Sequence, residues 1–268
     1  MIPFFQGNVY QSRWSPRLGA NYQFGVNGTQ HVLRAAVGRF MNNHLLTQPL
    51  LVPSETAGFP FAIDSFSGTE IRQAGGSWEA QWNPKTFTVL RLAALRLTNP
   101  SFLTLNDAAT GATFDQPMWQ TWKRYQASLV LNRILFDSLG LSAGVMGKRV
   151  IPDLSFDGII YPNNNINLRG FSEFNAFLGL AYLHPQGWLA RIKPLLVQQY
   201  GDITGHKADN PFVVLNLTLG RDFPNKRGFA LFEFQNLFNR RSFYTVEPDR
   251  DLEFSNQRRF LFRLGLYF

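Results

Sequence analysis

The sequence predicts an all-β fold, an antiparallel transmembrane β-barrel of which about 11–12 strands are present. Three observations predict it. Apolar and polar residues alternate over stretches of about ten residues, the length that crosses a bilayer at a tilt of about 45°. Tight turns and long loops alternate between these stretches, as short periplasmic turns and long extracellular loops do in outer-membrane barrels. Aromatic residues make up 15% of the chain, with 26 Phe, which suits the aromatic girdles of such barrels.

The last stretch of the chain shows the alternation most clearly. Between its apolar positions lies a mixed set that includes Arg259 and Arg263. Because side chains alternate between the two faces of a strand, this stretch is expected to have one apolar and one polar face. Its apolar set is Phe260, Phe262, Leu264, Leu266 and Phe268.

Ten earlier stretches alternate in the same way, which gives eleven expected strands in all. An outer-membrane barrel in a single bacterial chain has an even number of strands, so a further strand is expected, either from residues 4–14 or from a preceding segment. Pro194 falls within an expected strand and predicts a bulge there. The ten stretches cover residues 15–24, 31–40, 77–82, 86–97, 125–132, 139–145, 173–182, 188–199, 213–220 and 232–235.

The connections between the expected strands are of two kinds. Tight turns are indicated at Asn27-Gly28 and at residues 83–85, 137, 184–187 and 224–226, and Asn-Gly is a strong hairpin signal because both residues tolerate positive φ. All these turns fall on one side of the sheet, which is expected to be periplasmic. Long loops are expected on the other side, at residues 41–68, 99–117, 151–167, 199–210 and 239–254.

The polar positions of the expected strands are predicted to face the barrel interior. An Arg or Lys on the lipid face costs about 2–4 kcal/mol at mid-membrane, so charged residues are expected to point inward. The interior candidates are Arg34, Glu173, Asn175, Arg191, Lys193 and Arg263.

Composition argues against other classes of protein. The chain has no Cys, which excludes disulfides, and no apolar run of the roughly 18 residues that a membrane helix needs. Its net charge of +8 is scattered, without the dense basic run that would indicate nucleic-acid binding. A soluble β-sandwich or propeller is the remaining alternative fold.

No motif predicts catalysis, a cofactor or a metal site. Gly140–Gly144 matches G-x-S-x-G, but it lies inside an alternating stretch rather than at a strand-to-helix turn, so no enzyme is expected. The acids at alternate positions of residues 247–253 could offer oxygen ligands to calcium, although a solvated loop is the ordinary explanation. The histidines lack metal-ligand spacing and are expected to be surface residues: His31, His44, His184 and His206.

Several segments resemble the C-terminal barrel of TonB-dependent receptors and of their barrel-only relatives. They are SPRLGANYQF at Ser15–Phe24, HVLRAAVGRF at His31–Phe40, FQNLFNRRSF at Phe234–Phe243 and RRFLFRLGLYF at Arg258–Phe268. PLLVPSETAGFPF at Pro49–Phe61 resembles a subgroup in which tetratricopeptide repeats precede the barrel.

The resemblance implies ligand uptake across the outer membrane of a Gram-negative bacterium. It implies outer-membrane lipid and lipopolysaccharide as surroundings, and an assembly machinery that recognises the terminal aromatic Phe268 with the alternate apolar residues before it. The N-terminus shows no signal peptide and no plug domain. Residues 1–268 are therefore expected to be the C-terminal portion of the barrel, and contact with the TonB energy-coupling protein would need a missing N-terminal region. A structural, adhesion or export barrel without energised uptake is the alternative function.

Overall fold

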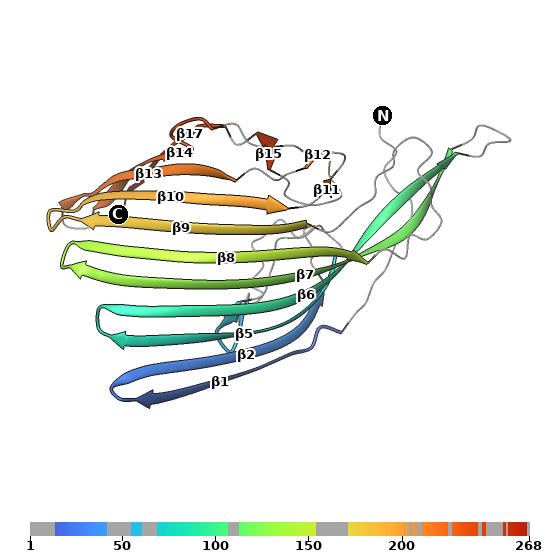
Figure 1. Ribbon diagram of the computed structural model, residues 1–268, viewed down its shortest axis with the longest axis horizontal. Coiled ribbons are helices and arrows are strands. Elements are labelled where there is room, and N and C mark those ends of the chain that lie inside the picture. The colour runs from blue at the N-terminus through green and yellow to red at the C-terminus, as the bar shows by residue number, and fades with distance from the viewer. Residues whose placement is uncertain are drawn as a thin grey trace.

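The computed structural model describes residues 14–41, 55–60, 69–106, 113–153, 171–200, 202–203, 206–207, 211–224, 227–240, 243–244, 254–255 and 257–266. The extended elements in these ranges are β-strands, and eleven of them form one antiparallel sheet (Figure 1). No helix among the described residues has the length and apolar character needed to span a membrane. The all-β antiparallel fold and the eleven expected strands are thus confirmed.

Each strand of the sheet is hydrogen-bonded to the strands next to it, and the described residues also form three two-stranded hairpins outside the sheet. In order across the sheet the strands are β1 (Arg17–Val26), β2 (Thr29–Met41), β5 (Glu70–Asn83), β6 (Thr86–Asn106), β7 (Thr113–Phe136), β8 (Leu139–Asp153), β9 (Phe171–Leu183), β10 (Trp188–Tyr200), β13 (Phe212–Asp222), β14 (Gly228–Gln235) and β17 (Arg259–Leu266).

The tight turns all lie at one end of the sheet, as the sequence predicts (Figure 1). The first of them carries Asn27 and Gly28 with φ of 49° and 78°, the conformation that the Asn-Gly pair favours in a two-residue hairpin. We call this end of the sheet the turn end and the opposite end the loop end. The order of strands follows the chain, so each strand pairs with its sequence neighbours in the sheet.

The two outermost strands of the sheet run in the same direction. β1 leads into the turn at Asn27, and β17 runs from Arg259, opposite Gln235, to Leu266, opposite Gly228 at the turn end. Direct pairing of β1 with β17 would therefore be parallel. Antiparallel closure of the sheet into a barrel needs a further strand between them, in line with the odd count in the sequence.

The expected loop at residues 99–117 is wrong for most of its length. β6 continues to Asn106 and β7 begins at Thr113, so the two strands form a hairpin that projects beyond the rest of the sheet (Figure 1). Beyond Thr98, β6 has only β7 as a partner, and Pro100 and Pro117 are paired in that extension. Proline is tolerated there because each strand of a two-stranded extension is an edge strand.

Three other expected loops also contain short hairpins. They are formed by β3 (Glu55–Thr56) with β4 (Phe59–Pro60), β11 (Asp202–Ile203) with β12 (His206–Lys207), and β15 (Phe243–Tyr244) with β16 (Phe254–Ser255). The predicted bulge at Pro194 is wrong as well. Ile192 faces Leu180 and Leu195 faces Phe177, so the register with β9 does not shift across the proline.

The two faces of the sheet differ in composition and exposure. We call the face that carries Leu33, Leu178 and Phe262 the apolar face, and its large side chains are 44%, 49% and 58% exposed. The opposite face, which we call the polar face, holds buried Gln73, Ser77, Arg124, Glu173, Asn175 and Gln199. In water-soluble proteins large apolar side chains collect inside and charges outside, so this sheet has the reverse arrangement.

A small hydrophobic cluster covers part of the polar face near the loop end. The β3–β4 hairpin supplies Phe59, which is 2% exposed, and the sheet supplies Ala36, Phe40, Ile71, Leu95, Leu97, Trp122 and Val150. Gln73 Nε2 donates to the Pro60 carbonyl at 3.0 Å, which fixes the hairpin against β5. The hairpin therefore packs on the polar face rather than extending away from the sheet.

Candidate functional site: the polar face of the sheet

The apolar face is bounded at the turn end by a cluster of aromatic rings. His31 stacks between Phe24 and Trp78, with ring centroids 5.0 and 5.9 Å away, and Trp82 packs edge-on against both His31 and Trp78. Trp78 Nε1 donates to His31 Nδ1 at 3.3 Å. This histidine, expected at the surface, lies partly exposed in an aromatic cluster on the apolar face. Such rings, apolar with one polar atom, are typical of the interfacial girdle of a membrane barrel.

The apolar band has the thickness of a membrane core. Arg72 lies on the apolar face near the loop end of β5 and Trp82 near its turn end, ten residues apart. Ten residues of strand span about 33 Å, which a tilt of about 45° reduces to about 23 Å. Outer-membrane barrels have an apolar band about 25 Å tall. The distance between the charged and the aromatic boundary therefore fits a bilayer crossing.

The structure places all six interior candidates on the polar face. Three of them, Arg34, Arg263 and Glu173, form ion pairs that sequence reasoning had not assigned. Arg34 pairs with Glu79 through two hydrogen bonds, Nε to Oε1 at 3.2 Å and Nη2 to Oε2 at 3.1 Å. Arg263 Nη2 lies 3.3 Å from Glu233 Oε2. In the Arg34–Glu79 and Arg263–Glu233 pairs the two residues come from neighbouring strands, so each pair links adjacent strands on the polar face.

Glu173 is the centre of a buried polar cluster on β8, β9 and β10. Its carboxylate accepts hydrogen bonds from Asn175 Nδ2 at 2.6 Å and from Gln199 Nε2 at 3.1 Å, and Lys148 Nζ lies 3.2 Å from Oε2. The Glu173 side chain is 3% exposed and that of Lys148 is 18% exposed. A carboxylate so far from water needs these partners, because an unpaired buried charge is strongly unfavourable.

Arg191 and Lys193 lie together near the turn end of the polar face. Lys193 Nζ sits 4.3 Å from the centroid of the Phe177 ring, a cation–π contact. Both cations line a pocket of about 450 Å³ with Asn132 and Ser142. Lys85 also lines it and lies 3.5 Å from Asp137 Oδ1, whereas Arg133 stands opposite Thr86 on the apolar face. No carboxylate is among the described residues that line the pocket, so Arg191 and Lys193 make it electropositive.

The residues that contact the interior candidates could not be found from the sequence, because alternation alone does not give the register between strands. Alternation assigns a residue to a face but does not say which residue stands opposite it on the next strand. Polar-face positions of expected strands or their extensions hold Glu79, Lys148, Phe177 and Glu233, and Gln199 is the next-to-last residue of β10. A register anchored on the turns could have found Glu79 opposite Val32, one step from Arg34.

Gly75, under the β3–β4 hairpin, is a sterically demanding position of the polar face, and Gly147 on the apolar face is its counterpart. A Cβ on Gly75 would collide with the Phe59 ring and come within 2.6 Å of the Leu92 carbonyl oxygen. A Cβ on Gly147 would meet no atom within 4 Å. Gly75 therefore provides the space in which Phe59 docks.

We expect Gly75→Val to release the hairpin. Overpacking costs about 1–3 kcal/mol, so thiol labelling of a Thr56→Cys reporter should accelerate by about tenfold or more in the Gly75→Val background. Gly147→Val is the matched control and should leave the labelling rate unchanged. Equal labelling rates in the two backgrounds would show that the hairpin does not depend on this space.

The expected apolar set of the last strand lies on the apolar face. Phe260, Phe262, Leu264 and Leu266 are 62%, 58%, 56% and 53% exposed, and Phe268 lies outside the described residues. Phe262 packs on Phe232 with ring centroids 4.7 Å apart, and Phe260 meets Phe234 edge-on at 5.5 Å. These aromatic pairs hold β17 on β14 through the face that carries the large apolar residues.

The remaining motifs acquire no chemical role in the described part of the chain. Gly140–Gly144 lies within β8, as expected from its alternation. His184 accepts a hydrogen bond from the Gln186 amide in a turn. The described residues contain no group of three or more His, Cys, Asp or Glu placed to hold a metal. The acids of residues 247–253 and His44 lie outside the described ranges.

Comparisons with known proteins give a likeness in structure. No protein-family model matches the chain, and no curated protein matches it in sequence. Among solved structures the chain is similar to the CymD monoaromatic hydrocarbon channel, with a TM-score of 0.38 and 15% sequence identity. The match covers 82% of this chain and 67% of that channel.

Proposed function

We propose that this chain forms the wall of an outer-membrane β-barrel and that a solute crosses the membrane along its polar face. The observation that carries the proposal is the reversed distribution of side chains over one eleven-stranded sheet. Large apolar residues are exposed on one face, while the Arg34–Glu79 pair and the buried Glu173–Lys148 pair lie on the other. Such a sheet is favourable when lipid covers the apolar face and an aqueous lumen meets the polar face.

The edges of the sheet support a barrel that this sheet alone does not complete. Unpaired backbone groups are not tolerated in lipid, so the edges at β1 and β17 must be covered. Their common direction means that an odd number of additional strands would close the barrel by antiparallel pairing. We therefore propose that a further strand, either from residues 4–14 or from a preceding segment, pairs with these edges.

The electropositive pocket gives the proposed pathway a preference for anions. Arg191 and Lys193 come from successive polar-face positions of β10 and line the same pocket. A cleft lined by charges of one sign concentrates ions of the opposite sign. Anionic solutes, including carboxylates with an aromatic ring that could stack near Phe177, fit this chemistry.

Conductance of the full-length protein in planar bilayers tests the proposal. We expect ion-conducting pores whose reversal potential in a salt gradient indicates a preference for anions. Arg191→Glu with Lys193→Glu should shift that preference toward cations, whereas the charge-preserving pair Arg191→Lys with Lys193→Arg should not. A folded, inserted protein without conductance would contradict transport and favour a structural or adhesion barrel.

Energised uptake of the TonB-dependent kind is the finer part of the proposal. It is supported by the resemblance of Phe234–Phe243 and Arg258–Phe268 to the last strands of that family. Uptake of the solute should then stop in cells that lack the energy-coupling protein. Undiminished uptake in such cells would leave a passive channel.

A further inference from the structure

We propose that the pocket lined by Arg191 and Lys193 is a saturable binding site for one small organic acid, held by a carboxylate at one end and by a hydroxyl group at the other. This inference rests on the proposed function, because it takes the polar face to border an aqueous lumen. It goes beyond a general preference for anions, since it gives the bound molecule a size, an orientation and an apolar body between two polar ends.

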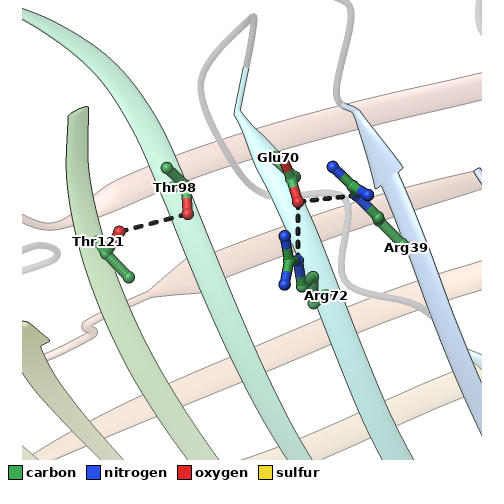
Figure 2. Close-up of polar contacts among 5 residues, drawn as sticks. All are labelled: Arg39, Glu70, Arg72, Thr98 and Thr121. Carbon is green, nitrogen blue, oxygen red and sulfur yellow. Dashed lines mark hydrogen bonds and ion pairs between the residues drawn. The ribbon is translucent and has the colours of Figure 1, made fainter. Parts of the chain in front are cut away.

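The two cations of the pocket have no acidic partner among the residues that the structure describes. Elsewhere on the sheet, close cations share a carboxylate: Glu70 Oε1 lies 2.8 Å from Nε of Arg39 and 2.8 Å from Nε of Arg72 (Figure 2). Successive positions of Arg191 and Lys193 on one face of β10 are about 7 Å apart. Their positive charges repel each other, so an anion that lies between them is favourable.

The ring of Phe177 holds the ammonium group of Lys193 in place. Lys193 Nζ lies 4.3 Å from the centroid of this ring. A Cβ on Gly144 would lie 2.7 Å from Cε1 of the same ring, so the ring packs directly on the backbone of β8. A cation that is already fixed loses less side-chain entropy when an anion binds. The pocket therefore has a preorganised positive charge.

Two uncharged polar side chains lie across the pocket from the cations. Asn132 stands opposite Ser142, and Ser142 stands opposite Gly179 on β9. On the other side of β9, Arg191 stands opposite Ala181. In the described part of the chain neither Asn132 nor Ser142 has a hydrogen-bond partner for its side chain. A molecule that extends from Arg191 to Ser142 therefore crosses only small residues and ends at free hydrogen-bonding groups.

The size of the pocket limits what it holds. Ser142 on β8 and Arg191 on β10 are separated by β9 alone, so the two backbones are about 10 Å apart. The pocket volume of about 450 Å³ lies in the lower part of the range of about 300–1,000 Å³ for small-molecule sites. A single ring with two substituents fits this space, whereas an oligosaccharide or a peptide does not.

The apolar part of the lining favours an organic acid over an inorganic anion. Phe87 and Ile134 line the pocket and are 49% and 46% exposed. A ligand with an apolar body would remove part of this surface from water, which is favourable. Phosphate or sulfate would contact the cations and leave the apolar surface in water. Arg133 and Leu141 of the apolar face also belong to the lining, and they take no part in these contacts.

Equilibrium binding of 4-hydroxybenzoate to the full-length folded protein in a non-ionic detergent tests the site. We expect saturable binding of one molecule, and Arg191→Gln with Lys193→Gln should weaken it by about 100-fold, about tenfold for each cation. The matched control, Arg149→Gln with Arg221→Gln, removes two cations from the apolar face and should bind as the unmodified protein does. No saturation, or unchanged binding by the first variant, would overturn the site.

A ligand series on the unmodified protein tests the same contacts without any risk of misfolding. The uncharged 4-hydroxybenzamide should bind about 100-fold more weakly than 4-hydroxybenzoate, and benzoate, which lacks the hydroxyl group, about tenfold more weakly. Asn132→Leu with Ser142→Ala should weaken binding of 4-hydroxybenzoate by about tenfold and leave that of benzoate unchanged. Equal binding of the benzamide would contradict the role of the cations, and equal binding of phosphate would overturn the choice of an organic acid.

Conductance in planar bilayers, measured on the same protein, separates this site from the proposed function. Anion-selective pores in a protein that does not bind 4-hydroxybenzoate would overturn the site and leave the proposed function in place. Saturable binding that depends on Arg191 and Lys193, in a protein that conducts no ions, would contradict transport and not the site.

Discussion

Replacing Leu217 by Arg is expected to block insertion of the barrel into a membrane, whereas Thr218→Arg on the same strand is expected to be tolerated. Leu217 stands opposite Ile192 and Phe234 on the apolar face, in the middle of β13. An Arg on the lipid face near the midplane costs about 2–4 kcal/mol. That is a large fraction of a typical net folding stability of about 5–15 kcal/mol.

Thr218 is the suitable control because it is adjacent in sequence and opposite in orientation. It stands opposite Glu233 and Arg191 on the polar face, where a new guanidinium has a carboxylate within reach. Asn216 is a poorer control, since its Oδ1 accepts the Asn236 backbone amide at 3.0 Å. Heat-modifiable mobility in outer-membrane fractions reports folding of both variants. Equal yields of folded protein would mean that the two faces are not lipid and lumen.

The arrangement of the sheet could be predicted from the sequence because two independent signals agree. Alternation assigns each residue to a face, and the turn signals, such as Asn27-Gly28, fix the order and direction of the strands. The six candidates share one face of the sheet for this reason. Neighbouring strands in a meander pair through short turns, so the topology follows once the strands are found.

The same reasoning could not predict how far the strands continue at the loop end. Pro100 and Pro117 indicate chain breaks in a sheet interior, yet both lie in a two-stranded extension where edge positions accept proline. The β3–β4 hairpin was missed because its turn uses Ala57 with φ of 52° before Gly58, and alanine gives no turn signal at that position. Local sequence contains no information about Phe59 docking against Gly75, which lies on β5.

The alternation rule itself could not predict that Arg72 and Arg96 lie side by side. Arg72 and Arg96 occupy positions that the rule assigns to the apolar face, where charge is unfavourable at mid-membrane. Only the register shows that these cations share one level near the loop end, where charge on a lipid face costs about 0–1 kcal/mol. Position along the strand therefore matters as much as the face for predicting what a charged residue does.

Replacing Glu173 by Leu is expected to produce the largest loss of stability on the polar face. The substitution leaves Lys148, which is 18% exposed, without the carboxylate 3.2 Å away, and it removes the acceptor for Asn175 and Gln199. Breaking a buried ion pair by removing one partner costs about 3–5 kcal/mol. Urea unfolding of the folded protein in bilayers or detergent measures the change in the free energy of unfolding.

A double substitution in the same cluster separates the effect of the charges on stability from the effect of side-chain shape. In Glu173→Leu with Lys148→Met both charges are gone, and replacement of a buried pair by apolar residues is often close to neutral, so most of the lost stability should return. Glu233→Leu is the exposed counterpart, because its partner Arg263 is 60% exposed, and it should cost about 0–1 kcal/mol. A loss in Glu173→Leu no greater than in Glu233→Leu would show that water reaches the Glu173 cluster in the assembled barrel, and the lumen would then be wide at the level of Glu173.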